Sequence, residues 1–290
     1  MTLTKASPCK VNLILNILGK RADGFHELET VMHPVNVCDE LAFVRGGSGV
    51  QLTCNHPELP VDSRNLVFRA AAAFLAEAKI FDGVKLHLEK RIPMAAGLGG
   101  GSGNAATTLL GLNELFGHPL NAAQLQTIAA SLGSDIPFFL QTKPALAVGR
   151  GEQVQSLEPF VCLRGTAILL VHPGFGISTP WAYKELARFP AALNGERGRA
   201  QRLVDTLRQR DLAAAAKDIY NSLEAPALEK FPVLALYQEF FRAHGALVSL
   251  MSGSGSTTFA IFANQAKAEA AIDPFQAKFG SAGWISVTLL

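Results

Sequence analysis

The sequence predicts a mixed α+β protein made of two lobes. Its 290 residues are 49% hydrophobic and only 17% charged, so the chain can bury a large core and is not typical of a disordered protein. At about 100 to 200 residues per domain, this length fits two moderate domains. Strand and helix patterns follow one another in mixed order without an internal repeat, which favours α+β lobes over an alternating βαβ sheet.

The first lobe opens with strand patterns over residues 10–18 and 40–45, which flank a Gly- and His-containing loop at 23–28. Asn65 then precedes apolar residues that recur with helical spacing. Because asparagine is a preferred N-cap, the pattern predicts a helix over 65–78.

A second strand and helix surround the richest glycine cluster of the chain. Residues 84–90 alternate apolar and polar side chains with the period of a strand, and helical spacing resumes over 104–116. Asn121 is a candidate N-cap, with Gln124 three residues later, for a further helix that ends at Gly133.

The second lobe is expected to begin near residue 160, which divides the chain into lobes of 1–160 and 161–290. Strand patterns are expected in it at 166–171, 246–251, 259–262 and 284–290, and a helix pattern at 265–279. The arginine-rich segment at 197–210 is interpreted as a solvated loop and helix face, since charge runs usually face solvent.

Charge and cysteine content exclude several classes of protein. The 26 Lys and Arg against 24 Asp and Glu give a formal charge of +2, too balanced for the basic surface on which nucleic-acid binding depends. The four cysteines have no CxxC spacing, which argues against a zinc site or a disulfide framework. No window approaches the roughly 20 apolar residues of a membrane span. We therefore expect a cytoplasmic protein with no nucleic-acid or membrane partner, and the sequence predicts no protein partner.

The glycine cluster over 97–103 lies between the predicted strand and helix. Consecutive backbone N–H groups in such a loop, next to a helix N-terminus, suit a phosphate chain. No GK[ST] follows, and the GxGxxG spacing is not met, so neither common nucleotide fingerprint applies. From the glycines alone, a phosphate loop is favoured over a flexible linker, but both readings stay open.

The segment Pro93-Met94-Ala95-Ala96-Gly97-Leu98-Gly99-Gly100-Gly101-Ser102 resembles the phosphate-binding motif of the GHMP kinases, the superfamily of galactokinase, homoserine kinase and mevalonate kinase. Four further segments, 6–13, 21–28, 133–139 and 251–255, resemble motifs of this family in the same order. Within the family they are most similar to the kinases of a cytidine diphosphate derivative of methylerythritol in the non-mevalonate isoprenoid pathway. The resemblance covers nearly the whole chain.

The resemblance implies a two-lobed GHMP kinase fold with the active site in the cleft between the lobes. It implies an ATP-dependent transfer of phosphate to the 2-hydroxyl of the cytidine diphosphate substrate, with ATP as co-substrate and Mg²⁺ as cofactor. Two alternatives stay open: another small-molecule kinase of this family, of the homoserine or mevalonate type, and a non-catalytic nucleotide-binding regulator.

The resemblance also implies two catalytic residues. Lys10 is similar to the family's active-site lysine, although by itself it reads as a lysine at a strand end with its ammonium in solvent. Asp135 is similar to the base that receives the proton of the attacking hydroxyl, although by position it could cap the turn that begins at Ile136 and Pro137.

The remaining site residues are implied in the same way. The ATP-binding set comprises Asn65 and Leu66 on the adenine side, and Pro93, Met94, Ala95, Ala96, Gly97, Leu98, Gly99, Gly100, Gly101, Ser102 and Gly103 around the phosphates. The substrate-binding set comprises Asn12, Phe25, His26 and Tyr183. The Ser102 hydroxyl could reach a metal or a phosphate oxygen, and the metal ligands are left unassigned.

Overall fold

The computed structural model of the chain describes residues 2–281 and 283–290, which form two compact units. Unit 1 contains the chain up to Cys9, Val37–Ile92 and Gly99–Thr142. Unit 2 contains Lys10–Asn36, Pro93–Leu98 and Lys143–Leu290. The units interleave along the chain, and the sequence-based boundary near residue 160 stays a prediction.

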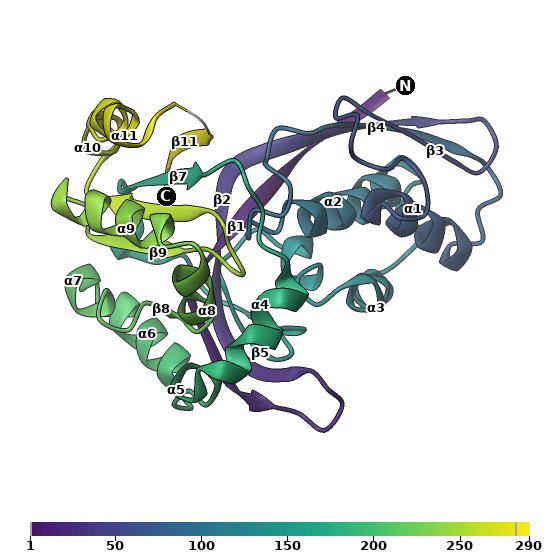
Figure 1. The fold of residues 1–290 in the computed structure, drawn as a ribbon. Coiled ribbons are helices and arrows are strands. Elements are labelled where there is room, and N and C mark those ends of the chain that lie inside the picture. Colours follow the sequence, from purple (N-terminus) through teal and green to yellow (C-terminus); the bar gives the residue numbers. More distant parts are fainter. Residues whose placement is uncertain (1, 282) are drawn as a thin grey trace. The chain divides into compact units, whose positions relative to one another are not determined.

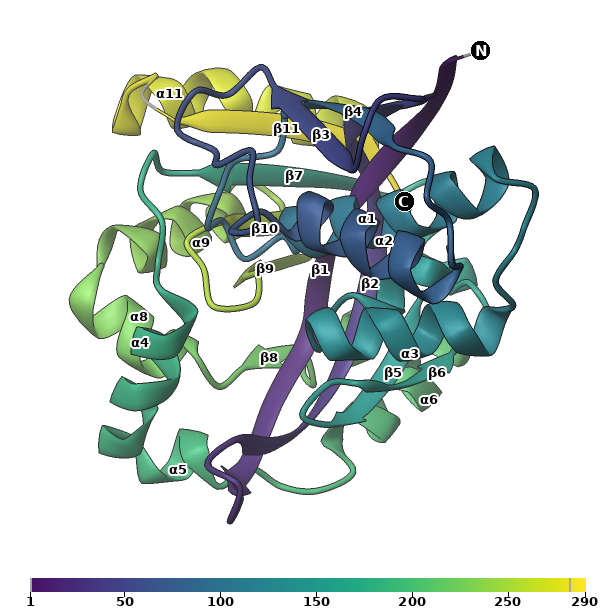
Figure 2. The same cartoon turned by 90° about the vertical axis from the view of Figure 1, so that its right-hand side faces the viewer.

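Two long neighbouring strands, β1 (Thr2–Lys20) and β2 (His26–Arg45), contribute residues to both units (Figure 2). The predicted strands 10–18 and 40–45 lie inside them, but the prediction was too short. The part of β2 that the prediction missed, residues 26–39, contains buried polar residues that interrupt the apolar pattern: Glu29 is 8%, His33 is 9% and Asp39 is 0% exposed.

Unit 1 has helices packed beside a small set of strands (Figure 1). β3 (Val50–Cys54) pairs in parallel with β4 (Val84–Glu89), and β4 pairs antiparallel with the end of β2. The helix α1 (Leu66–Glu77) packs on α2 (Gly100–Leu115) and α3 (Ala122–Leu132), and the 3₁₀ helix η1 (Pro137–Leu140) follows. A Cβ atom at Gly111 of α2 would lie 2.5 Å from the Phe43 ring, so α2 lies directly on β2.

The predicted helix caps of unit 1 are confirmed. The Asn65 side chain accepts a hydrogen bond from the Val67 N–H at 2.9 Å, and Asn121 and Gln124 form a capping box. The start of α2 was predicted wrongly at Asn104. The helix begins at Gly100 because the Gly103 N–H donates to the Gly99 carbonyl at 2.8 Å, which brings low-propensity glycines into the first turn.

Unit 2 contains a four-stranded antiparallel sheet in the order β11 (Trp284–Leu289), β7 (Ala167–His172), β10 (Thr258–Phe262) and β9 (Val248–Met251). The helices of unit 2 are α4 (Thr179–Glu185), α5 (Pro190–Leu193), α6 (Arg199–Arg208), α7 (Leu212–Ala215), α8 (Glu224–Lys230), α9 (Val233–Ala243), α10 (Gln265–Ala270) and α11 (Ile272–Phe279). Of these, α9 and α10 pack on the sheet, and the apolar core of the unit includes Phe241, Phe262 and Phe275.

The single helix predicted over 265–279 is two helices, α10 and α11. Pro274 lacks an N–H group and is tolerated only in a first helical turn, so a new helix begins just before it. The arginine-rich segment is confirmed as a solvated face: Arg202 and Arg208 are exposed, whereas Leu203 and Leu207 of the same helix are buried.

Shorter elements complete unit 2: β5 (Ala145–Gly149), β6 (Gln153–Ser156), β8 (Tyr220–Asn221), and the 3₁₀ helices η2 (Val161–Leu163) and η3 (Leu186–Arg188). β8 pairs in parallel with β1, where Leu15 lies opposite Asn221. Among the described residues, no helix has both the length and the apolar character needed to span a membrane.

Candidate active site

Lys10 lies on β1, within unit 2. It is next to Gly97 and Leu98, the first two residues of the glycine-rich loop (97–103). Its backbone N–H donates to the Leu98 carbonyl at 3.0 Å, and its ammonium donates to the Gly97 carbonyl at 3.2 Å. The residue is 3% exposed. The Lys10 ammonium is therefore buried and hydrogen-bonded to a loop carbonyl. The interpretation of Lys10 as a lysine at a strand end with its ammonium in solvent is wrong.

Asn12 lies two residues along the same strand and gives the lysine a second acceptor. The Lys10 ammonium donates to Asn12 Oδ1 at 2.5 Å. The Asn12 amide group donates in turn to Thr30 Oγ1 at 2.9 Å, and the Thr30 hydroxyl donates to the Ile14 carbonyl at 2.6 Å. This chain of hydrogen bonds fixes the amide so that its oxygen faces the ammonium.

The late glycine motif, residues 251–255, packs on the same loop. Ser252 Oγ donates to the Gly97 carbonyl at 3.0 Å, and the Thr257 N–H donates to the Ala96 carbonyl at 3.2 Å. Gly253 has a φ of +55°, and a Cβ atom there would lie 2.8 Å from the Gly97 oxygen and 3.3 Å from the Lys10 ammonium nitrogen. Glycine is therefore required for this close approach.

Asn221 holds the late glycine motif in place. Its side-chain amide donates to the carbonyls of Met251 and Gly253 at 2.8 and 2.7 Å, and the residue is 1% exposed. Sequence reasoning assigned no role to Asn221, Thr30 or Ser252. A Ser-Gly-Ser-Gly run signals the loop at Ser252, but single polar residues in strands carry no such signal for Thr30 and Asn221.

The second half of the glycine-rich loop forms the first turn of α2, within unit 1. Gly99 is the N-cap, has a left-handed φ of +68° and offers no side-chain cap. The first N–H groups of a helix have no partner within the helix and carry its positive dipole end. Gly103 must lack a side chain because a Cβ atom there would lie 2.6 Å from the Pro8 carbonyl. This helix end suits a phosphate group.

Asn65 and Leu66 begin α1 in the same unit. Leu66 Cδ1 would lie 3.7 Å from a Cβ atom at Gly101, so this side chain lies next to the start of α2. Asn65 uses its oxygen to cap α1 and donates its amide to the Pro60 carbonyl at 2.7 Å. Both of its polar atoms thus have partners within the protein, and its contact with adenine stays a prediction.

Asp135 is partly buried in the turn between α3 and η1. The N-cap position of η1 is held by Ile136, with no side-chain cap. Asp135 is therefore not the N-cap of this helix, and its catalytic role stays a prediction. Ser102 is partly buried in the first turn of α2, where its hydroxyl is near the helix N-terminus.

Three of the predicted substrate-binding residues, Phe25, His26 and Tyr183, have ring side chains and belong to unit 2. The rings of His26 and Tyr183 have centroids 5.0 Å apart at an interplanar angle of 39°. Phe25 is 53% exposed, and the Arg150 guanidinium lies over its ring at 4.7 Å. Burial, together with the charge of Lys20, lowers the pKa of His26 below 6.5. This shift favours the neutral imidazole, which has one donor and one acceptor nitrogen.

Comparison with known proteins places the chain in a family. The GHMP kinases N terminal domain matches residues 65–143, and the GHMP kinases C terminal domain matches residues 203–281. The 4-diphosphocytidyl-2-C-methyl-D-erythritol kinase of Synechococcus sp. (strain JA-3-3Ab) is 41% identical, over 93% of this chain and 88% of the relative. The enzyme of that name from Geobacter metallireducens is 37% identical, over 99% and 98% of the two chains.

Solved structures agree with this placement. A crystal structure of 4-(cytidine 5'-diphospho)-2C-methyl-D-erythritol kinase superposes with a TM-score of 0.82 at 33% identity and covers 98% of both chains. Homoserine kinase from Cytophaga hutchinsonii has a TM-score of 0.76 at 18% identity, which shows a shared fold only. The predicted α+β fold class is confirmed. With both family domains matched and such relatives spanning nearly its whole length, the chain belongs to the GHMP kinase family.

Proposed function

We propose that this chain is an ATP-dependent kinase that phosphorylates the 2-hydroxyl of 4-diphosphocytidyl-2-C-methyl-D-erythritol in the methylerythritol phosphate (non-mevalonate) isoprenoid pathway. The products are the 2-phosphate and ADP. The observation that carries the proposal is identity of 37 and 41% over nearly the whole chain with kinases of that name. ATP is the co-substrate of the GHMP kinase family, and a cytoplasmic location stays a prediction.

The ATP phosphates are proposed to bind at the glycine-rich loop, through Pro93 to Gly103. The support is the start of α2, where the N–H groups of the first turn have no partner within the helix and, with the helix dipole, attract an anion. Asn65 and Leu66 are proposed to lie on the adenine side, because Leu66 is next to the start of α2.

Lys10 and Asp135 are proposed as the catalytic pair. Phosphoryl transfer depends on positioning and on stabilising charge at the transferred group. The Lys10 ammonium, fixed by Asn12 and Gly97, offers that charge without a need to reorganise. The Asp135 carboxylate would accept the proton of the 2-hydroxyl as it attacks.

Mg²⁺ is proposed as the cofactor, held with the ATP phosphates. The described residues contain no group of three or more His, Cys, Asp and Glu side chains that could hold a metal. Mg²⁺ commonly keeps several waters and binds through substrate phosphates with only one or two protein oxygens. The Ser102 hydroxyl, in the first turn of α2, could supply such an oxygen. When bound, the ion would neutralise charge on the β- and γ-phosphates.

The cytidine end of the substrate is proposed to bind at His26 and Tyr183, with Phe25 and Asn12 as further contacts. The support is the pair of rings at 5.0 Å, together with the neutral imidazole that can donate to or accept from the polar edge of cytosine. Phe25 offers an exposed aromatic face, although Arg150 covers one side of it.

One assay tests the proposal against both alternatives. The protein is incubated with ATP, Mg²⁺ and, in separate reactions, the cytidyl substrate, homoserine and mevalonate, and ADP release is measured. Turnover with the cytidyl substrate alone is expected. Turnover with homoserine or mevalonate instead would assign another kinase of the family, and ATP binding without turnover on any of the three would leave a nucleotide-binding regulator.

A further inference from the structure

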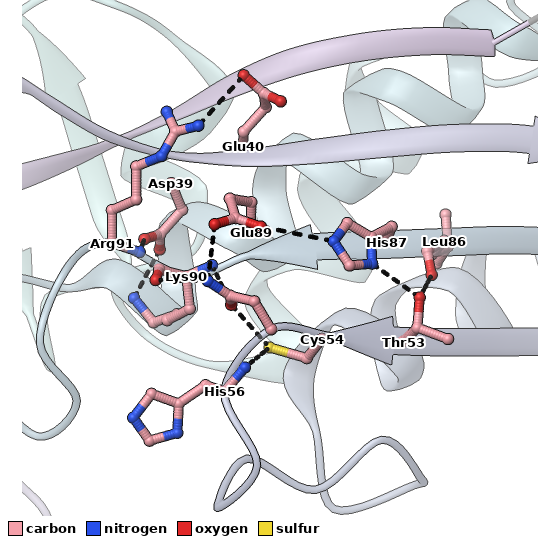
Figure 3. Close-up of polar contacts among 11 residues, drawn as sticks. Asp39, Glu40, Thr53, Cys54, His56, Leu86, His87, Glu89, Lys90 and Arg91 are labelled. Carbon is pink, nitrogen blue, oxygen red and sulfur yellow. Dashed lines mark hydrogen bonds and ion pairs between the residues drawn. The ribbon is translucent and has the colours of Figure 1, made fainter.

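A buried ion pair lies where β4 leads into the glycine-rich loop, within unit 1. Lys90 Nζ and Asp39 Oδ2 are 2.6 Å apart, and the two side chains are 5% and 0% exposed (Figure 3). At the other end of the same pair of strands, Arg45 and Asp82 form an ion pair that is more than half exposed. Because the desolvation of a buried pair offsets much of its attraction, stability alone is a weak explanation for this one.

Asp39 and Lys90 also form hydrogen bonds with the backbone of the two residues that precede Pro93. Asp39 Oδ1 accepts from the N–H groups of Arg91 and Ile92 at 2.7 and 2.8 Å. The Lys90 ammonium donates to the Ile92 carbonyl at 2.6 Å. The Asn55 side chain, directly after β3, accepts from the Lys90 N–H at 2.8 Å. The backbone that enters the loop is thus fixed at three successive residues.

The same ammonium also lies against the start of α2. A Cβ atom at Gly100, the first residue of that helix, would lie 3.3 Å from Lys90 Nζ and 3.2 Å from the Ile92 side chain. Ile92 precedes the loop and Gly100 follows its left-handed residue Gly99. The Lys90 ammonium therefore donates to one end of the segment and lies next to the other. An ammonium near a positive helix end is unfavourable by itself, and the Asp39 carboxylate neutralises it.

We infer that Asp39 and Lys90 are positioning residues for ATP: the pair sets the spacing between the end of β4 and the N-terminus of α2, where the phosphates bind. The inference rests on the proposed function. Neither residue is assigned a contact with the reacting atoms, and both act through the backbone of Ile92 and Gly100. Their loss should therefore weaken ATP binding and spare the alcohol site.

The test compares the variants Asp39→Asn, Lys90→Met and their combination with Asp82→Asn as the exposed control. For each protein, the KM of ATP, the KM of the alcohol, kcat and the midpoint of thermal unfolding are measured. Both single variants are expected to raise the KM of ATP by about 10- to 100-fold, since small displacements of binding groups have effects of this size. The KM of the alcohol should change less than about twofold, and Asp82→Asn should resemble the wild type.

The double variant separates positioning from stability. It removes both buried charges together, so its unfolding midpoint is expected to recover relative to the single variants. If the KM of ATP recovers with it, the pair is merely structural and the inference is wrong. A KM of ATP that stays high in a stable double variant supports it. Gly100→Ala, which presses on Lys90 without burying an unpaired charge, is expected to raise the KM of ATP as well, and an unchanged value there would contradict the inference.

Failure of the proposed function has a different signature. If the wild-type chain phosphorylates none of the alcohols, calorimetric titration with ATP still reports nucleotide affinity directly. Weaker ATP binding in the stable double variant would then support positioning by Asp39 and Lys90. Equal affinity in wild type and double variant would overturn the inference independently of the substrate.

Discussion

The Lys10 ammonium donates to the Asn12 amide oxygen at 2.5 Å, from two positions on the same face of β1. Residues i and i+2 of a strand project to one side, so the strand itself brings the charge and its acceptor together. The Asn12 amide is fixed by Thr30, and the ammonium also reaches the Gly97 carbonyl. The lysine is therefore held in one position before any substrate binds.

Replacement of Asn12 should release this lysine. We expect Asn12→Ala to lower kcat/KM by about 10- to 100-fold, since a hydrogen bond to a charged group contributes about 1.5 to 3 kcal/mol. Asn12→Asp keeps an oxygen for Lys10 and loses only the donor to Thr30, so it should lose less activity. Steady-state assays measure kcat/KM of both variants. An equal loss in the two would show that the activity does not depend on the oxygen that accepts from Lys10.

The left-handed glycine at the start of α2 gives a second prediction. Gly99→Val should strongly weaken ATP binding, because a β-branched residue does not readily adopt a φ of +68° and its side chain would obstruct the phosphates. Gly117, just after the same helix, has a φ of +76° and no neighbour within 4 Å of a built Cβ atom. Gly117→Val therefore carries a similar backbone strain away from the loop.

Calorimetry with ATP on both folded variants separates the two effects. Gly117→Val should keep wild-type affinity while it lowers the unfolding midpoint. Unchanged ATP affinity in folded Gly99→Val would restore the reading of the glycine cluster as a linker.

Much of the fold was predictable from the sequence because its signals are local. Asn65 and Asn121 mark helix starts through their own side chains, and the alternation over 84–90 marks β4. The length of β2 was missed, since buried polar residues in it have their partners far along the chain: Glu29 accepts hydrogen bonds from Asn16 and from the Gly198 N–H. The interleaving of the two units along the chain depends on contacts between distant segments, which no local pattern encodes.

The candidate site shows the same division. Its glycines and the family motifs are readable in the sequence, whereas the residues that orient them are not. Thr30, Asn221, Asp39 and Lys90 act by hydrogen bonds to residues from 2 to 53 positions away. Such partners become visible only once the strands are paired.

The pair of rings at His26 and Tyr183 predicts separate effects on the two substrates. His26→Ala should raise the KM of the cytidyl substrate by about 10- to 100-fold, because a buried polar edge without a partner costs about 1 to 3 kcal/mol. The KM of ATP should stay near its wild-type value. Tyr183→Phe keeps the aromatic ring and should raise the KM of the cytidyl substrate less than His26→Ala does. An equal rise in both KM values would indicate a folding defect and contradict the cytidine assignment.

Glu224 predicts a pH dependence of stability. Its carboxyl accepts from the Met251 N–H at 2.8 Å and from the Gln238 amide at 2.5 Å, and burial raises its pKa from 4.5 to about 7. Between these values the unfolded chain loses the proton while the folded protein keeps it. The contribution of Glu224 to the free energy of unfolding should therefore fall as the pH rises from 4.5 to 7, by an amount on the order of 2 to 3 kcal/mol.

Glu224→Gln isolates this contribution. Glutamine keeps an oxygen acceptor for Met251 and Gln238 but does not titrate. The variant should match the wild type near pH 4.5 and be more stable than it at pH 8. Urea unfolding at a series of pH values measures the difference between the two proteins, and a difference that stays constant from pH 4.5 to 8 would show that Glu224 does not titrate in this range.

Asp135 gives the sharpest test of the mechanism. Since Ile136 holds the N-cap of η1, the carboxylate is not needed to cap that helix, and Asp135→Asn should retain the fold. The amide cannot accept the hydroxyl proton, so turnover at saturating ATP and substrate should fall by about 10² to 10⁴. Lys10→Met should also slow phosphoryl transfer, and thermal unfolding confirms that each variant is folded.

The two substitutions should be less than additive in combination, because residues that serve one transition state lose their effect together. A double variant only slightly slower than the slower single variant is therefore expected. Fully additive losses would mean that Lys10 and Asp135 act on separate steps. Near-normal turnover in folded Asp135→Asn would remove the base from the mechanism, and the rate enhancement would then depend on Lys10 and on the N–H groups at the start of α2.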